Sequence, residues 1–397
     1  MERIRKILTV ERLSDCIYAL ALIFTVCSCV WELPVRHSAR AIIIFMTIGI
    51  ILYPNCLAEL KKIRGILTAL LAFVLMLTFE AWYGGHFKET VSDYSFWFNY
   101  NMLLIPAFFL AKPSRKRLEN LLTGSALSLL IVDFYIFWQF FNESTRPVMP
   151  MGGNPMMTAT LYVLLVPAIF IAALKSENEN LRRLYAIFTF FNIAAAFLTG
   201  TRALWVTLGI VMFATLFFCS ENLKKALLGA SLILILIFSI SYNNEYFQSR
   251  LASVGNLREH SQAQRLLMWQ SAFNMFSDHP IFGVGTGNYT PLYQQKYILP
   301  QADEPFQMHA HSNYFQMLGE CGLFGFVTYC ASFGYIIYWS YLRRRNFFGM
   351  VLLSSTASFM IYSTTDYTFY GYVGMRILWF LIALCAVGSF LCESEKL

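Results

Sequence analysis

Four residues have side chains suited to phosphate binding and proton transfer. Arg146, Arg202 and Arg265 each lie in a polar stretch beside apolar segments, and His311 lies where a long polar stretch ends. Guanidinium groups bind phosphate oxygens bidentately, and three around one pocket suit a diphosphate better than a single phosphate. Histidine is the usual general base near neutral pH. If all four face one side of a membrane, they describe a site for an anionic, lipid-linked substrate.

Two further residues join this group as predicted substrate-binding residues. Arg376 lies within the last apolar segment, where a charge is costly and needs a reason other than topology. His309 lies two residues before His311 and would point to another face of a helix, so we expect His311 to be the base. A simpler interpretation also exists, because a histidine at a helix start is often interfacial and Arg265 alone could be a solvated residue.

Two other motifs suggest chemistry that we do not favour. Residues 283–287 read GVGTG, like part of a phosphate loop, but no Lys-Ser/Thr pair follows them. Asp303, Glu304, His309 and His311 are metal-ligand types, but their spacing matches no strong site. We therefore expect a glycine-rich turn at 283–288, no bound metal and no cofactor.

The composition indicates a helical membrane protein. Apolar residues make up 57% of the chain and charged residues 13%, whereas soluble proteins carry about 25% charged residues. Apolar runs near the length that spans a bilayer recur throughout. The net charge of +7 resides largely in short loops, which argues against nucleic acid as a partner. None of the nine cysteines lies in the loop 242–310, so a disulfide framework or zinc site there is not expected.

The predicted fold is an all-α, polytopic bundle of about twelve spans, with residues 1–397 forming a single integral membrane domain. The spans are predicted near 14–32, 41–57, 66–83, 95–111, 119–141, 156–174, 183–199, 203–219, 225–241, 312–340, 347–363 and 371–391. The segment 312–340 is long, so its first turns are expected to tilt or project above the bilayer.

Basic residues predict the orientation. With the N-terminus inside and the spans alternating, the inner segments hold 20 of the 30 Lys and Arg residues. Four of the other ten lie in the long loop 242–310, where they count less, so the short loops divide 20 against 6. Both termini are therefore predicted to be cytoplasmic, and the loop 242–310 periplasmic. Within that loop, 264–278 is predicted to be an amphipathic helix stopped by His279-Pro280, followed by a flexible turn at 283–288.

Four stretches together resemble the O-antigen ligase/polymerase superfamily, whose members handle glycans carried on undecaprenyl diphosphate. They are Arg146 with GGNP (152–155), TGTRALW (199–205), QRLLMWQSAFNMFSDHPIFGVGTGNY (264–289) and HAHSNYFQMLGECGLFGF (309–326). The order of the spans and the position of the large loop are also similar to that family.

The resemblance implies roles for individual residues. Arg202 and Arg265 match the family's diphosphate-contacting arginines, Arg146 matches a further positive position, and His311 matches the essential histidine. It implies a metal-independent, inverting glycosyltransferase of a bacterial inner membrane, with an active site that faces the periplasm. The ligase branch is favoured: the donor would be an undecaprenyl-diphosphate-linked glycan and the acceptor lipid A-core, within membrane lipid.

Two alternatives stay open at this point. A polymerase, using a second lipid-linked glycan as acceptor, carries close relatives of the same motifs. A lipid-linked glycan transporter would favour charges near the bilayer midplane, whereas these charges cluster at the outer ends.

Overall fold

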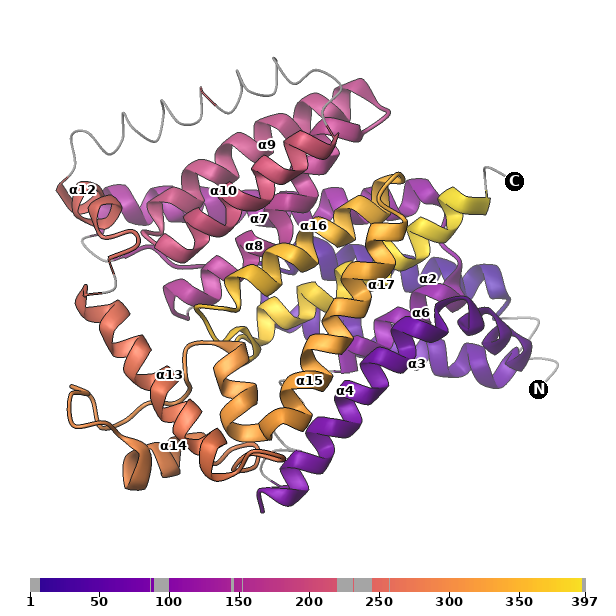
Figure 1. Cartoon of the computed structure of the whole chain (residues 1–397). Helices are drawn as coiled ribbons and strands as arrows, with labels where there is room; N and C mark the ends of the chain where they lie inside the picture. The colour runs from indigo at the N-terminus through magenta and orange to yellow at the C-terminus, as the bar shows by residue number, and fades with distance from the viewer. Residues whose placement is uncertain are drawn as a thin grey trace.

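The protein is described by a computed structural model covering residues 8–85, 87–88, 100–143, 146–151, 153–219, 231, 245–256 and 258–394. All regular structure in these ranges is helical, which confirms the predicted all-α class (Figure 1). The helices before the polar stretch are α2 (Val10–Cys27), α3 (Glu32–Leu52), η1 (Pro54–Ile63), α4 (Arg64–Tyr83), η2 (Tyr100–Leu103), α6 (Leu104–Ala111), α7 (Arg115–Asn142), α8 (Pro155–Lys175), α9 (Glu179–Leu198) and α10 (Arg202–Cys219).

The polar stretch and the C-terminal part are helical as well. Their elements are α12 (Glu245–Ala252), α13 (His260–Asp278), α14 (Tyr289–Leu292), the short turn η3 (Tyr293–Tyr297), α15 (Asn313–Leu342), α16 (Phe347–Tyr362), η4 (Thr368–Tyr370) and α17 (Tyr372–Ser394). Figure 1 shows α13 and α14 beside the first turns of α15, at one end of the bundle.

Seven described helices are long and apolar enough to cross a membrane, and three shorter apolar helices accompany them. The polytopic bundle is thereby confirmed. Apart from residue 231, the span expected at 225–241 lies outside the described residues, so the total of about twelve stays a prediction.

The division predicted between the first two spans is wrong. Spans were expected at 14–32 and 41–57, but α3 already begins at Glu32. The true turn, 28–31, reads SCVW and gives no polar signal, whereas the polar start of α3 resembles a loop. Pro34 is tolerated there because the first turn of a helix needs no amide donor, and Arg36 pairs with Glu32 one turn away at 3.2 Å.

The centre of the bundle consists of α8 and α17. Their most apolar windows are 78% and 89% buried, and both helices are apolar on all sides, as expected for helices surrounded by protein. A polar contact fastens the neighbours of α8: Asp133 on α7 accepts hydrogen bonds from Tyr162 on α8 at 2.7 Å and from Asn192 on α9 at 2.5 Å. These helices carry the turns that hold Arg146 and Arg202.

Helix α15 breaks at Gly322, which has a left-handed φ of 59°. The predicted tilt of its first turns therefore takes the form of a kink. The first half of α15 packs against α13, and the helix also contacts α4 and α16. The kink allows a chain from the polar stretch to approach the α15 backbone, as described below.

Candidate functional site

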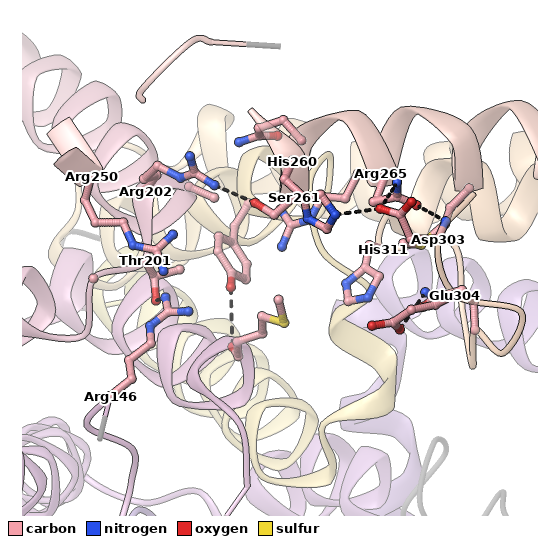
Figure 2. Close-up of a pocket in the computed structure, with 18 residues that line it drawn as sticks. Arg146, Thr201, Arg202, Arg250, His260, Ser261, Arg265, Asp303, Glu304 and His311 are labelled. Atoms are coloured by element: carbon pink, nitrogen blue, oxygen red, sulfur yellow. Dashed lines mark hydrogen bonds and ion pairs between the residues drawn. The ribbon is translucent and has the colours of Figure 1, made fainter. Parts of the chain in front are cut away.

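A cavity of about 310 Å³ lies at one end of the bundle, and widely separated segments line it. Arg146, Arg202, Arg265 and His311 all contribute, and Arg250 adds a fourth guanidinium. Figure 2 shows Arg146, Arg202 and Arg250 on one side of this cavity and His311 with Asp303 and Glu304 on the other. Four of the six residues expected to form the site therefore meet at one place.

Arg146 is held by the turn between α9 and α10. Its Nε donates to the Thr199 carbonyl at 2.5 Å and its Nη2 donates to Thr201 Oγ1 at 2.8 Å. The turn is tight because Gly200 adopts a left-handed φ of 64°, the conformation that ends many helices at a glycine. The TGT sequence thus sets the direction of the Arg146 guanidinium.

Arg202 is the first residue of α10, and its side chain is only 10% exposed. It donates to Ser253 Oγ at 2.8 Å and Ser261 Oγ at 2.7 Å, and it pairs with Glu259 at 2.9 Å. Burial acts to raise the pKa of Glu259, but hydrogen bonds from Ser261 and Arg202 outweigh it and hold that pKa below its usual value. An anionic carboxylate therefore already contacts the guanidinium in this state.

Arg265 lies in the first half of α13, which ends at Asp278 before His279-Pro280, as the sequence predicts. Its Nη1 donates to the carbonyl of Thr365 at 2.9 Å. Thr365 belongs to the turn between α16 and α17, so Arg265 links the polar stretch to the turn that carries Asp366.

His311 faces the carboxylate of Asp366. The distance between His311 Nδ1 and Asp366 Oδ1 is 3.6 Å, and the two side chains are 18% and 6% exposed. His311 also has a left-handed φ of 49°, a conformation that costs a non-glycine residue on the order of 1–3 kcal/mol and concentrates at functional sites. A histidine whose Nδ1 faces a carboxylate keeps Nε2 as a proton acceptor.

Asn313 holds these two residues together. Its backbone amide donates to the Ser363 carbonyl at 2.9 Å, and its side chain exchanges two hydrogen bonds of 2.8 Å with Thr368. The start of α15 is thereby fixed to the turn that carries Asp366. Helix α15 starts at Asn313 with Ser312 as its N-cap, so His311 precedes the helix rather than opening it.

His309 also precedes the helix, so the expected separation of the two histidines by helical faces does not apply. The two rings lie 4.3 Å apart, and the His311 amide donates to His309 Nδ1 at 3.3 Å. Burial, followed by the neighbouring His311, lowers the pKa of His309 to about 3. His309 lies behind the cavity wall beside Asp366 and Tyr367.

Arg376 lies elsewhere, on α17 and away from the cavity lining. It is 5% exposed and contacts Glu32 of α3 at 3.4 Å. Tyr372 donates to the same carboxylate at 3.1 Å. This arrangement joins α3 to α17 and accounts for an arginine inside an apolar segment.

The suggested metal ligands do not assemble. Asp303 contacts His260 at 2.6 Å, and Glu304 accepts from Gln307 at 3.2 Å. Within the described ranges, no group of three or more histidine, cysteine or acidic side chains is arranged to hold a metal ion.

The glycine-rich turn at 283–288 was expected to be flexible, but it is fixed to α15. The amides of Val284 and Gly285 donate to Gly319 and Glu320 at 3.1 and 2.7 Å. Gly283, with φ of 64°, lies so close to the Glu320 backbone that a Cβ atom would collide with it. Packing against the kinked helix therefore explains Gly283, whereas Gly285 approaches the backbone of Gly84 at the end of α4.

Three residues at the site were not predicted, namely Asp366, Glu259 and Arg250. Asp366 was detectable by the rule that selected the arginines, because it is a charged residue in a short turn between two apolar segments. Glu259 and Arg250 lie in a polar loop, where a charge gives no comparable signal.

A family model described as O-antigen ligase matches residues 184–330. The matched segment contains Arg202, Arg265 and His311, whereas Arg146 and Asp366 lie outside it. No curated protein matches the chain. The match and the apolar helices together identify a multi-pass membrane protein and a glycosyltransferase-like enzyme that uses lipid-linked substrates.

Proposed function

We propose that this chain, whose residues 184–330 match a family model described as O-antigen ligase, transfers a glycan from undecaprenyl diphosphate to a sugar hydroxyl of lipid A-core. The observation that carries the proposal is the shared cavity, which Arg146, Arg202, Arg265 and His311 line together. The paired arrangement of His311 and Asp366 supports a base at that cavity.

The arginines bind the donor in this proposal. Their guanidinium groups hold the diphosphate oxygens and stabilise the negative charge that grows as the diphosphate leaves. Before the donor binds, the carboxylate of Glu259 forms an ion pair with the guanidinium of Arg202. Donor binding therefore exchanges one anionic partner of Arg202 for another.

His311 activates the acceptor. Its Nε2 takes the proton of the acceptor hydroxyl while the hydroxyl oxygen attacks the anomeric carbon. The bond from that carbon to the diphosphate oxygen breaks, and the electron pair leaves with the diphosphate. Attack opposite the leaving group inverts the anomeric centre. Neither a metal nor a nucleotide takes part in this reaction.

We place the reaction at the periplasmic face of a bacterial inner membrane, with both termini in the cytoplasm. The 20-to-6 division of basic residues among the short loops supports this orientation. The loop 242–310 then lies in the periplasm as part of a single membrane domain.

The test uses purified protein, undecaprenyl-diphosphate-linked glycan and lipid A-core, with excess EDTA and no ATP. We expect glycan on lipid A-core, and a loss of about 10²–10⁴-fold in rate for His311→Ala. His279→Ala, which changes an exposed histidine at the end of α13, is the matched control and should be active.

Other products would overturn the ligase assignment. Longer lipid-linked glycan formed without lipid A-core would identify a polymerase. Movement of intact donor across vesicles without any transfer would identify a transporter. Activity lost in EDTA and restored by one divalent ion would contradict the metal-independent reaction.

A further inference from the structure

A second cavity, of about 690 Å³, lies at the opposite end of the bundle. Arg115, Lys175, Arg344 and Arg345 line it, and Glu177 is the one acidic residue among its described lining residues. We call it the basic cavity. Arg115 pairs with Glu177 at 2.7 Å, so the lining retains a clear excess of positive charge.

The two cavities are separated by the length of the helices. Helix α7 begins at Arg115 in the basic cavity and ends just before Arg146 in the first cavity. Helix α8 also connects the two cavities: Met156, near its start, lines the first cavity, and Lys175, its last residue, lines the basic cavity. At 1.5 Å per residue, these helices extend roughly 30–40 Å, which is the thickness of a membrane. The basic cavity therefore opens at the other membrane surface.

The local backbone also favours an anion in the basic cavity. Helices α7 and α16 both begin at its wall, at Arg115 and Phe347. Helix N-termini carry partial positive charge and attract anions. They add to the field of the four basic side chains rather than forming a site alone.

An apolar groove continues from this cavity along the bundle. It has a volume of about 190 Å³ and shares Phe218, Arg344 and Met350 with the basic cavity. The rest of its described lining is apolar except Thr215 and Ser354, whose hydroxyls bond to each other at 3.3 Å. A groove with its few polar groups satisfied suits a hydrocarbon chain.

Arg344 lies at the junction of the two spaces. Its guanidinium lies 4.0 Å from the centre of the Tyr341 ring and donates to the Tyr341 carbonyl at 2.9 Å. Tyr341 lines the groove. A ligand that contacts Arg344 with an anionic group therefore has an apolar path directly beside that group.

We propose that the basic cavity and the apolar groove together bind one membrane lipid with an anionic phosphate head group. The phosphate contacts the basic side chains, and an acyl chain follows the groove beside α10 and α16. A basic cavity that continues into an apolar groove matches a lipid, which has an anionic head group and an apolar tail. A soluble phosphate would leave the groove unused. The site is separate from the proposed glycan transfer and does not depend on it.

The test measures lipids retained by the purified full-length protein, using native mass spectrometry in nanodiscs of phosphatidylglycerol or phosphatidylcholine. We expect selective retention of phosphatidylglycerol and a higher melting temperature with it. Arg344→Gln with Arg345→Gln should weaken retention roughly 25-fold, since each basic residue near an anionic head group contributes about a fivefold factor. Lys116→Gln with Arg182→Gln removes two charges near the same surface outside the cavity and should change little.

A groove variant makes the test independent of charge. Ala357→Phe fills the groove and should reduce phosphatidylglycerol retention while the basic residues are intact. Equal retention of the two lipids, or an equal loss in the control variant, would overturn the proposal. Displacement of the lipid by equimolar glycerol 3-phosphate would show a soluble-phosphate site instead. If the double variant fails to fold, the single variants Arg345→Gln and Ala357→Phe test the proposal instead, and each should retain less phosphatidylglycerol than the wild type.

Discussion

The imidazole of His311 faces the carboxylate of Asp366, with 3.6 Å between Nδ1 and Oδ1. The two residues come from different turns, and Asn313 fastens those turns together. Distances of this size between a base and its orienting group often shorten when substrate binds. The relationship makes Asp366 a positioning residue for the proposed base.

The first prediction concerns Asp366→Asn. The amide preserves the size of the side chain but removes the charge that favours a proton on Nδ1 of His311. We expect kcat to fall at least about tenfold, but by less than the roughly 10²–10⁴-fold loss from removing the base itself, while KM for the lipid-linked donor stays near that of the wild type. Steady-state transfer kinetics with donor and acceptor varied separately measure this. A rise in donor KM without a change in kcat would assign Asp366 to binding instead.

The second prediction concerns the arginines. Arg202→Lys keeps a positive charge but loses the planar fork that contacts Ser253, Glu259 and Ser261. We expect a large loss of transfer with normal membrane insertion. Arg265→Ala should mainly weaken donor capture, seen as a higher donor KM.

Arg258→Ala is the control for Arg265→Ala, because it removes an equal charge from the same polar loop outside the cavity lining. Transfer at the wild-type level in both Arg202→Lys and Arg265→Ala would contradict the proposal that these arginines bind the donor diphosphate.

The third prediction concerns Glu259→Gln. In this state Glu259 contacts Arg202 at 2.9 Å, so a donor diphosphate must compete with it. The neutral amide competes less well, and we expect a donor KM a few-fold lower than in the wild type, because a partly exposed ion pair contributes about 1 kcal/mol or less. Donor binding to the detergent-purified protein measures the effect. A weaker affinity would mean that Glu259 holds Arg202 in its binding orientation.

The sequence indicated four of the residues that line the cavity, but not the contacts that hold them there. Arg146, Arg202 and His311 were identifiable because a charge or histidine beside an apolar segment is costly and therefore informative, whereas the choice of Arg265, inside the polar loop, rested on the family resemblance. Placing every turn on one side of a membrane is a condition for these residues to meet, but their meeting in one cavity depends on tertiary packing. The stop of α13 at His279-Pro280 was equally readable, because proline restricts the residue before it.

The pairings were not predictable from the sequence alone. Glu32 and Arg376 lie far apart in the chain, and only the tertiary fold, in which α6 packs against both α3 and α17, brings them within 3.4 Å. His309 and His311 were assigned to different helical faces, but the helix starts after them, at Asn313. Local patterns indicate which elements form, whereas contacts between elements depend on tertiary packing.

The fourth prediction is a pH dependence of stability. The pKa of His309 is lowered to about 3 by burial and by His311, with Arg265 adding to the effect and Asp366 opposing it. Between the ordinary value of about 6.5 and about 3, the unfolded chain binds a proton that the folded protein excludes. The contribution of His309 to the free energy of unfolding is therefore fully present above about pH 6.5 and decreases as the pH falls through this window.

We expect the melting temperature of the purified protein to fall between pH 7 and pH 5, and to fall less in His309→Gln. His279→Gln changes an exposed histidine and should keep the wild-type slope. Identical slopes in the wild type and His309→Gln would show that other groups control the acid sensitivity.

The last prediction concerns orientation. Asn288 follows the glycine turn fixed to α15, whereas Arg345 lines the basic cavity past the far end of the same helix. The turn is fixed to Gly319 and Glu320, and the part of α15 after the Gly322 kink runs to Leu342, roughly 30 Å at 1.5 Å per residue, enough to separate the two positions by a membrane. A reporter fused after Asn288 should be active only in the periplasm, and one fused after Arg345 only in the cytoplasm, because basic residues favour the cytoplasmic side. Periplasmic activity of the Arg345 fusion would reverse the orientation and would place the arginine-lined cavity on the cytoplasmic side, away from a periplasmic acceptor.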